Sequence, residues 1–148
     1  MAAHHCRVTQ AVAIAALNAA VDLVDAGTPP GHIILYTGAE PTHRNDAAGT
    51  EVATCALDTT AFGAASYNGT NHAAEASLTA PATDPHATGH AAAVTYFRIC
   101  NAAGTAIMQG TCSATAGDDL VISPAAIISV GAVVEITTLV VSVPIDQA

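Results

Sequence analysis

The chain has 148 residues and a formal net charge of −9, and only 10% of its residues are charged. The three basic residues are Arg7, Arg44 and Arg98, and lysine is absent, so the chain lacks the clustered cations that bind phosphate groups. We therefore expect no nucleic-acid partner and no anionic membrane surface as a partner. The length suits a single domain over residues 1–148.

The low charge content has two interpretations, and the composition leaves both open. Hydrophobic residues make up 51% of the chain but aromatic residues only 3%, so a core built from it consists mainly of small aliphatic side chains. Either neighbouring molecules cover part of the surface, which would also stabilise such a thin core, or Thr, Ser and Asn solvate that surface.

The N-terminal region contains the clearest helical pattern. Residues 9–26, "TQAVAIAALNAAVDLVDA", have apolar residues at three- and four-residue spacing, which predicts a helix capped by Thr9 and ended by Gly27. Residues 1–7 lack such a pattern, and we predict that they form an arm that orders only against a neighbouring molecule, ahead of a body over residues 8–144. The buried face of the helix is expected to contain Ala13, Leu17, Ala20, Val21 and Val24.

Short apolar or alternating segments after the helix predict strands. Phe62 is expected to be a core anchor within an irregular segment, residues 58–70. Two polar, turn-rich stretches, residues 39–50 and 81–91, are expected to be exposed loops. The predicted strands in this part of the chain are residues 32–38, 51–57 and 71–80.

Residues 94–110, "VTYFRICNAAGTAIMQG", predict a β-hairpin, because two apolar strands flank the turn cluster "NAAG". Strict alternation places Phe97 and Ile99 in the core. The same alternation places Tyr96 and Arg98 on the outer face.

The C-terminal third predicts three more strands, at residues 119–123, 124–130 and 131–144. In the last of these the apolar positions change parity, so we predict a β-bulge at Thr137–Thr138 that keeps both halves facing inward. One helix and about eight closely spaced strands indicate a mainly β fold, an antiparallel β-sandwich or jelly roll with one N-terminal α-helix.

Histidine, cysteine and acidic residues are present, but they are not at the spacings that a catalytic or metal site requires. No zinc signature, nucleophile motif or nucleotide fingerprint occurs, so we expect no enzymatic activity, no metal and no cofactor. The cysteines are interpreted as small buried residues in a reducing cytosol, with a disulfide formed after release as the alternative. They are Cys6, Cys55, Cys100 and Cys112.

The order of segments resembles that of jelly-roll capsid decoration, or cement, proteins of tailed bacteriophages. The resemblance covers residues 8–144. It rests on an Ala/Leu helix ending "DAGTPPG", then "IILYTGAEP", "EVATCAL" and "AFGAAS", and later "TYFRICNAAGTAIMQGTC" before a terminal Val/Thr strand. It implies a structural virion protein, assembled in the host cytoplasm, that binds the outer surface of the phage head. It also implies two partners, the major capsid protein and further copies of this chain in a homotrimer.

Arginine and tyrosine are favoured at protein interfaces. The arginines and the one tyrosine that are expected to be exposed are therefore the candidate interface residues. For Arg98 an internal ion pair with an acidic residue such as Glu135 is the open alternative. For the whole chain the alternative function is a phage tail or adhesion module that binds a host receptor through residues 39–50 and 81–91. The candidate interface residues are Arg7, Arg44, Tyr96 and Arg98.

Overall fold

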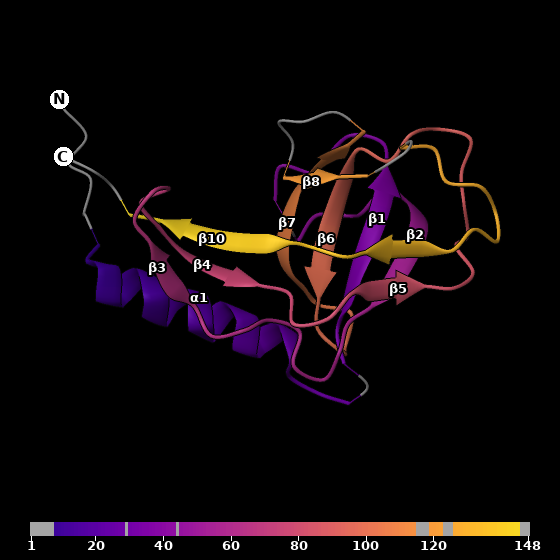
Figure 1. Cartoon of the computed structure of the whole chain (residues 1–148). Helices are drawn as coiled ribbons and strands as arrows, with labels where there is room; N and C mark the ends of the chain where they lie inside the picture. The colour runs from indigo at the N-terminus through magenta and orange to yellow at the C-terminus, as the bar shows by residue number, and fades with distance from the viewer. Residues whose placement is uncertain (1–7, 29, 44, 115–118, 123–125, 146–148) are drawn as a thin grey trace, which may run out of the picture.

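The computed structural model describes residues 8–28, 30–43, 45–114, 119–122 and 126–145. Within these ranges the chain forms one α-helix and ten β-strands, arranged as a seven-stranded sheet and a three-stranded sheet (Figure 1). This confirms the predicted class, mainly β with antiparallel sheets and one N-terminal helix. The predicted arm, residues 1–7, lies outside the described residues.

Helix α1, Gln10–Val24, begins where the sequence indicates. The side chain of Thr9 accepts a hydrogen bond from the backbone N–H of Val12 and so satisfies a donor that the first helical turn leaves open. Four of the five expected inward residues are buried, and Ala20 is half-buried. The buried ones are Ala13, Leu17, Val21 and Val24.

Two polar side chains fasten α1 to the segment that leads into the small sheet. Asn18 Oδ1 accepts the backbone N–H of Ala65, and Asp25 Oδ1 accepts that of Ala61, both at 2.8 Å. A carboxylate at a helix C-terminus is disfavoured by the helix dipole. Here that cost is offset because Asp25 satisfies a part-buried backbone donor.

The seven-stranded sheet has the order β8-β7-β6-β1-β2-β5-β9, and every neighbouring pair is antiparallel except β7 with β8. The sheet is curled, so that its two end strands both line one cavity of about 280 Å³. Its strands are β1 (His32–Thr37), β2 (Thr50–Ala56), β5 (Ala82–Asp84), β6 (Tyr96–Cys100), β7 (Ala106–Ser113), β8 (Leu120–Val121) and β9 (Val134–Ile136).

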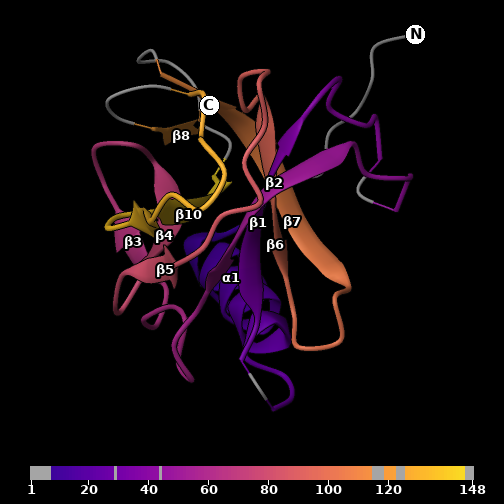
Figure 2. The same cartoon turned by 90° about the vertical axis from the view of Figure 1, so that its right-hand side faces the viewer.

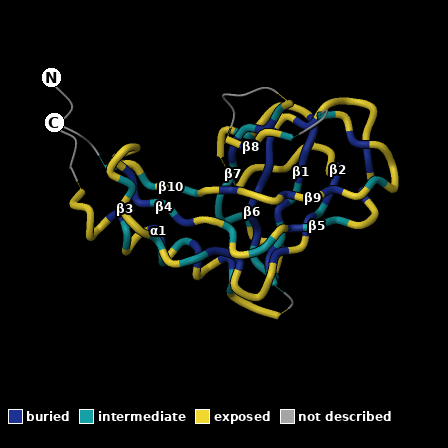
Figure 3. Tube along the Cα trace, viewed as in Figure 1, coloured by how far each residue is buried: buried dark blue, intermediate teal, exposed yellow. Residues whose placement is uncertain are grey.

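The three-stranded sheet has the order β10-β4-β3, with β10 at Val140–Pro144, β4 at Ala73–Ser77 and β3 at Ser66–Asn68. Helix α1 packs on all three strands and also reaches β7 (Figures 1 and 2). One continuous cluster of buried residues joins the inner faces of both sheets and α1, and buried positions recur along the strands (Figure 3). Many of these residues are alanines, which let the layers approach closely but contribute little buried area each.

Four predictions about strands require correction. The segment over residues 58–70, expected to be irregular, contains β3. The expected loop over residues 81–91 contains β5, and residues 126–130 form no strand. Residues 131–144 are not one bulged strand: β9 belongs to the large sheet and β10 to the small one, so the change of parity marks the point where the chain passes between sheets. Actual register shifts lie between Leu35 and Tyr36 in β1 and between Ile99 and Cys100 in β6.

The contact of α1 with the core is testable by truncating Leu17, which is 1% exposed. Leu17→Ala is expected to lower the free energy of unfolding by about 2–5 kcal/mol, because it removes buried methyl groups and leaves a cavity. Val12→Ala, at a half-exposed position of the same helix, is the control and should change that free energy by no more than about 0.5 kcal/mol. Urea denaturation measures both, and equal effects would contradict the assigned packing.

Candidate functional site

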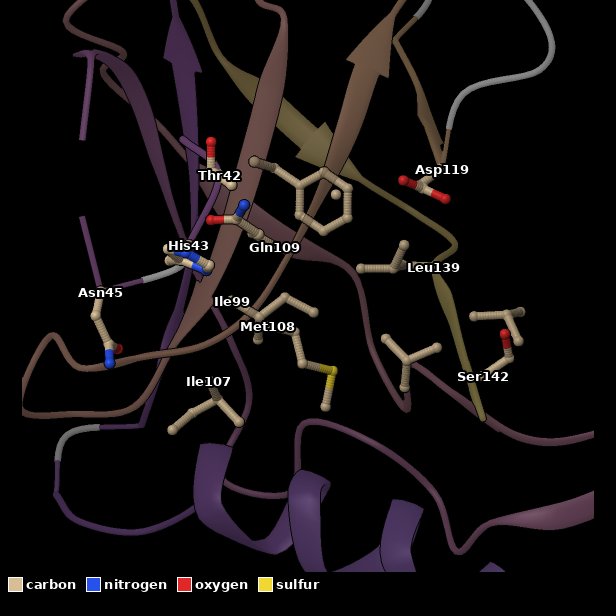
Figure 4. Close-up of a pocket in the computed structure, with 14 residues that line it drawn as sticks. Thr42, His43, Asn45, Ile99, Ile107, Met108, Gln109, Asp119, Leu139 and Ser142 are labelled. Atoms are coloured by element: carbon tan, nitrogen blue, oxygen red, sulfur yellow. The ribbon is translucent and has the colours of Figure 1, made fainter. Parts of the chain in front are cut away.

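A groove lies between β7 of the large sheet and β10 of the small sheet, with a cavity volume of about 710 Å³ (Figure 4). Buried or half-buried apolar side chains form its floor, and polar side chains of Thr42, His43, Asn45, β7 and β10 form its rim. Its volume lies within the range of ordinary ligand sites. The floor is made by Phe97, Ile99, Ile107, Met108, Leu139 and Val141.

At the groove, β7 and β10 each have one edge that pairs with no other strand of the described residues. Strand β8 pairs with β7 only at Cys112 and Ser113, and β10 is an end strand of its sheet. Cys112 N donates to the carbonyl oxygen of Thr95, the residue just before β6. Alternation along β7 therefore directs the backbone N–H and C=O of Gln109 away from β6. Neither edge has a charged side chain, although charge is the usual protection of an exposed edge.

The end of the groove nearest β8 is closed by Asp119. Its Oδ2 accepts hydrogen bonds from the backbone N–H of Thr111 at 2.8 Å and from the Thr111 hydroxyl at 3.0 Å. Glycine is required at position 110, because a Cβ there would lie 2.8 Å from Asp119 Oδ2 and 2.9 Å from a Phe97 ring carbon. The Asp119 carboxylate, which lies nearest the groove floor, is therefore already hydrogen-bonded within the chain.

Residues 38–49 form a strap that crosses the outer face of β1, β6 and β7. The strap is fastened at four points. Thr95 Oγ1 donates to Gly38 O, Gln109 Nε2 donates to Pro41 O at 2.7 Å, and Arg98 donates to Asp46 O at 3.0 Å. The backbone N–H of Gly49 donates to the Tyr96 hydroxyl at 2.5 Å. The strap therefore has a defined position and carries His43 and Asn45 to the groove rim.

The structure contradicts the expected outward position of Tyr96 and Arg98. Tyr96 is 0% exposed and Arg98 6% exposed, because the strap covers the face that alternation assigned to solvent. The Tyr36 and Tyr96 rings stack at 5.1 Å, and the Arg98 guanidinium lies 6.0 Å from the centroid of the Tyr36 ring. Both side chains therefore hold the strap in the folded chain.

The other candidate interface residues have different outcomes. Arg7 and Arg44 lie outside the described residues. The alternative ion pair of Arg98 with Glu135 is also wrong, because Glu135 lies in β9, with β1, β2 and β5 between it and β6. Arg98 Nε and Gln109 Oε1, on directly paired residues, are buried atoms for which the structure gives no hydrogen-bond partner.

Burial also determines the protonation of the groups on this sheet. It raises the pKa of Tyr36 to about 12, and Cys100 and Glu51 add to the rise. It raises the pKa of Cys55 to about 12, with Asp84 adding to the rise, and it raises the pKa of Cys100 against the opposing effect of Arg98. Both thiols are therefore protonated near neutral pH, the less nucleophilic form.

The sequence does not predict the exposed surface of residues 126–133, hereafter the apolar loop. Val130, Val133 and Ile127 are 82%, 69% and 57% exposed, the highest values among the large hydrophobic side chains of the described residues. The available signal was the absence of any charged residue between positions 120 and 134. The apolar residues there predict strands over 124–130 and 131–144 instead.

The part of the chain that the structure describes contains neither a cluster of metal-binding side chains nor a membrane-spanning helix. There, no three His, Cys, Asp or Glu side chains gather closely enough to hold a metal ion. No helix in these residues has the length and hydropathy needed to cross a membrane. Comparison with protein-family models, with curated proteins and with solved structures found no match to this chain.

The fastening of the strap is testable with Tyr96→Phe, which removes only the hydroxyl that Gly49 uses. The expected loss is about 0.5–1.5 kcal/mol of unfolding free energy, the usual net value of one hydrogen bond, together with faster hydrogen exchange at the Gly49 amide. Tyr67→Phe, at an exposed tyrosine of β3, is the matched control and should leave Gly49 unchanged. Unchanged exchange at Gly49 in Tyr96→Phe would refute the fastening.

The buried thiols predict a dependence of stability on alkaline pH. The pKa of Cys55 is higher in the folded chain than in the unfolded chain, so the unfolded state loses its proton first as pH rises. The stability contribution is complete below about pH 9 and decreases between about pH 9 and pH 12. In urea titrations over this window, Cys55→Ala should reduce the slope of unfolding free energy by up to about 1.4 kcal/mol per pH unit. An unchanged slope would contradict the shift.

Proposed function

We propose that this protein is a structural component of a tailed-bacteriophage virion. It is a capsid decoration, or cement, protein that binds the outside of the assembled head and stabilises contacts between major capsid subunits. The sequence resemblance described above supports the proposal. The structural observation that carries it is the apolar loop, because a chain of net charge −9 places its three most exposed large aliphatic side chains among the described residues on one uncharged segment.

The physical basis of such stabilisation is linkage. A protein that binds the assembled shell and not its separated subunits stabilises the shell by RT ln(1 + [L]/Kd) for each site. Symmetric repetition of the contact allows each one to be modest while the sum over the particle is large. A net charge of −9 keeps free copies apart until they meet a complementary surface.

The proposal is tested by the copy number of this chain in purified particles of the phage that encodes it, measured by peptide mass spectrometry against the major capsid protein. We expect a number close to that of the shell subunits. The second measurement adds the purified protein to shells that lack it, and the temperature of shell disruption should rise with added protein until the sites are filled.

Two other results would overturn the proposal. A few copies per particle would favour the tail or adhesion module that binds a host receptor, with the surface around the strap as its candidate site. Absence from the particle would remove both virion functions.

A further inference from the structure

The turn between β3 and β4 follows the one asparagine of this chain that precedes a glycine. Asn68 ends β3, and Gly69 opens the turn over residues 69–72. Because glycine has no Cβ, its backbone nitrogen is unhindered toward the preceding side chain. We infer that Asn68 is a site of self-modification: the Gly69 nitrogen closes a five-membered succinimide ring on the Asn68 side chain, and hydrolysis of the ring leaves a carboxylate.

The reaction consumes no reactant other than water. The Gly69 nitrogen forms a bond to Asn68 Cγ, and the bond between Cγ and Nδ2 breaks. The proton of the Gly69 N–H passes through solvent to Nδ2, which leaves as ammonia. Water then opens the succinimide at one of its two carbonyl carbons, so the product at position 68 is either aspartate or isoaspartate. The chain is neither oxidised nor reduced.

The Gly69 N–H is available for this step, and the fold does not require glycine at this position. Among the described residues the Gly69 N–H donates no hydrogen bond. The left-handed residue of the turn is His72, with a φ of +50°, and Gly69 lies outside that region. A Cβ added at Gly69 would meet nothing closer than Tyr67 Cε1 at 3.7 Å, an ordinary contact. The glycine therefore matters here for access to Asn68 Cγ.

The turn also stabilises the charge that develops during ring closure. Asn68 Oδ1 accepts the backbone N–H of Thr70 at 2.9 Å and that of Asn71 at 3.3 Å. Attack at Cγ places negative charge on this oxygen, and donors that are already aimed at it lower the barrier. The same two hydrogen bonds hold the side-chain amide against the turn, so less of its freedom remains to be lost before the ring closes.

The product does not fit the hydrogen bonds that Asn68 makes. Asn71 Nδ2 donates to Glu75 Oε1 at 2.6 Å, and Asn68 Nδ2 donates to Glu75 Oε2 at 2.8 Å. The hydrogen bonds from Asn71 and Asn68 lower the pKa of Glu75, so its carboxylate is charged near neutral pH. After the reaction a second carboxylate faces Glu75 in place of a donor, and the two repel. The net charge passes from −9 to −10, because a neutral amide becomes a carboxylate.

The effect extends to the small sheet. Glu75 is the middle residue of β4, which pairs with β3 and β10 and packs on α1, at the left of Figure 1. The carbonyl oxygen of His72 accepts the backbone N–H of Ile145, the residue after β10, at 2.9 Å. Loss of the hydrogen bond between Asn68 and Glu75 therefore loosens the turn and the contact that fixes the end of β10. The change is one-way, because ammonia leaves.

This inference goes beyond the proposed function and does not rest on it, and it is tested on the isolated, folded chain. The protein is incubated in mildly alkaline buffer, and peptide mass spectrometry follows the replacement of each side-chain amide by a carboxylate. A protein isoaspartate methyltransferase detects the isoaspartate product. We expect conversion at Asn68, while Asn18, Asn45, Asn71 and Asn101 stay intact. An Asn68 that stays intact, or that reacts no faster than the other four, would overturn the inference.

Gly69→Ala should slow the conversion at least about tenfold, because its Cβ hinders the attacking nitrogen. Gly63→Ala is the matched control, since Gly63 also lies outside the left-handed region, and a Cβ there would lie 3.8 Å from Ser77 O. Gly63 does not follow an asparagine, so this variant should react at the rate of the parent protein. Circular dichroism checks that both variants are folded. Equal rates in Gly69→Ala and the parent would refute attack by the Gly69 nitrogen.

Asn68→Asp reproduces the aspartate product directly. It should shift the midpoint of unfolding to a lower urea concentration and make hydrogen exchange at the Ile145 amide faster. In a Glu75→Gln background the same substitution should shift the midpoint less, because a glutamine amide can donate to the new carboxylate. Equal shifts in the two backgrounds would contradict the opposition of the two carboxylates.

Discussion

Strand β6 is buried on both faces, and the arrangement of the candidate surfaces depends on this. On one face Phe97 and Ile99 reach the core and the groove floor. On the other face Tyr96 and Arg98 hold the strap. A strand buried on one face only would leave residues 38–49 without these anchors, and the groove would lose the rim that the strap supplies. The same five-residue strand therefore stabilises the core and places the polar side of the groove.

The covalent path of the chain explains why the groove exists. Residues 137–139 carry the chain from β9 in the large sheet to β10 in the small one, and β10 then runs beside the uncovered part of β7. The two sheets meet there without sharing hydrogen bonds between these strands, since β7 pairs with β6 and β8, and β10 pairs with β4. The result is an apolar seam whose edges are uncharged. In a solitary protein such edges are a liability, whereas in an assembly they are contact surface.

Local patterns in the sequence predicted the elements whose partners are close in the chain. The helix, its cap and the β6–β7 hairpin follow from spacing and turn residues. The burial of Tyr96 and Arg98 could not be predicted by alternation, because the strap that covers them comes from about fifty residues earlier. The apolar positions of residues 131–144 do change parity where β9 ends and the chain passes to β10. A bulge and a change of sheet produce the same change of parity in the sequence, so the sequence pattern could not distinguish them. The groove was missed for a related reason: its two sides are brought together only by the fold.

The distribution of charge links the fold to assembly. Two of the described acidic groups are hydrogen-bonded within the chain, Asp119 to Thr111 and Asp25 to Ala61. Repulsion between whole molecules is long-ranged but screened beyond about 8 Å at physiological salt, whereas apolar contact acts only when surfaces touch. The net charge of −9 therefore acts between separated molecules, whereas the apolar loop can contribute only once a surface is in contact with it.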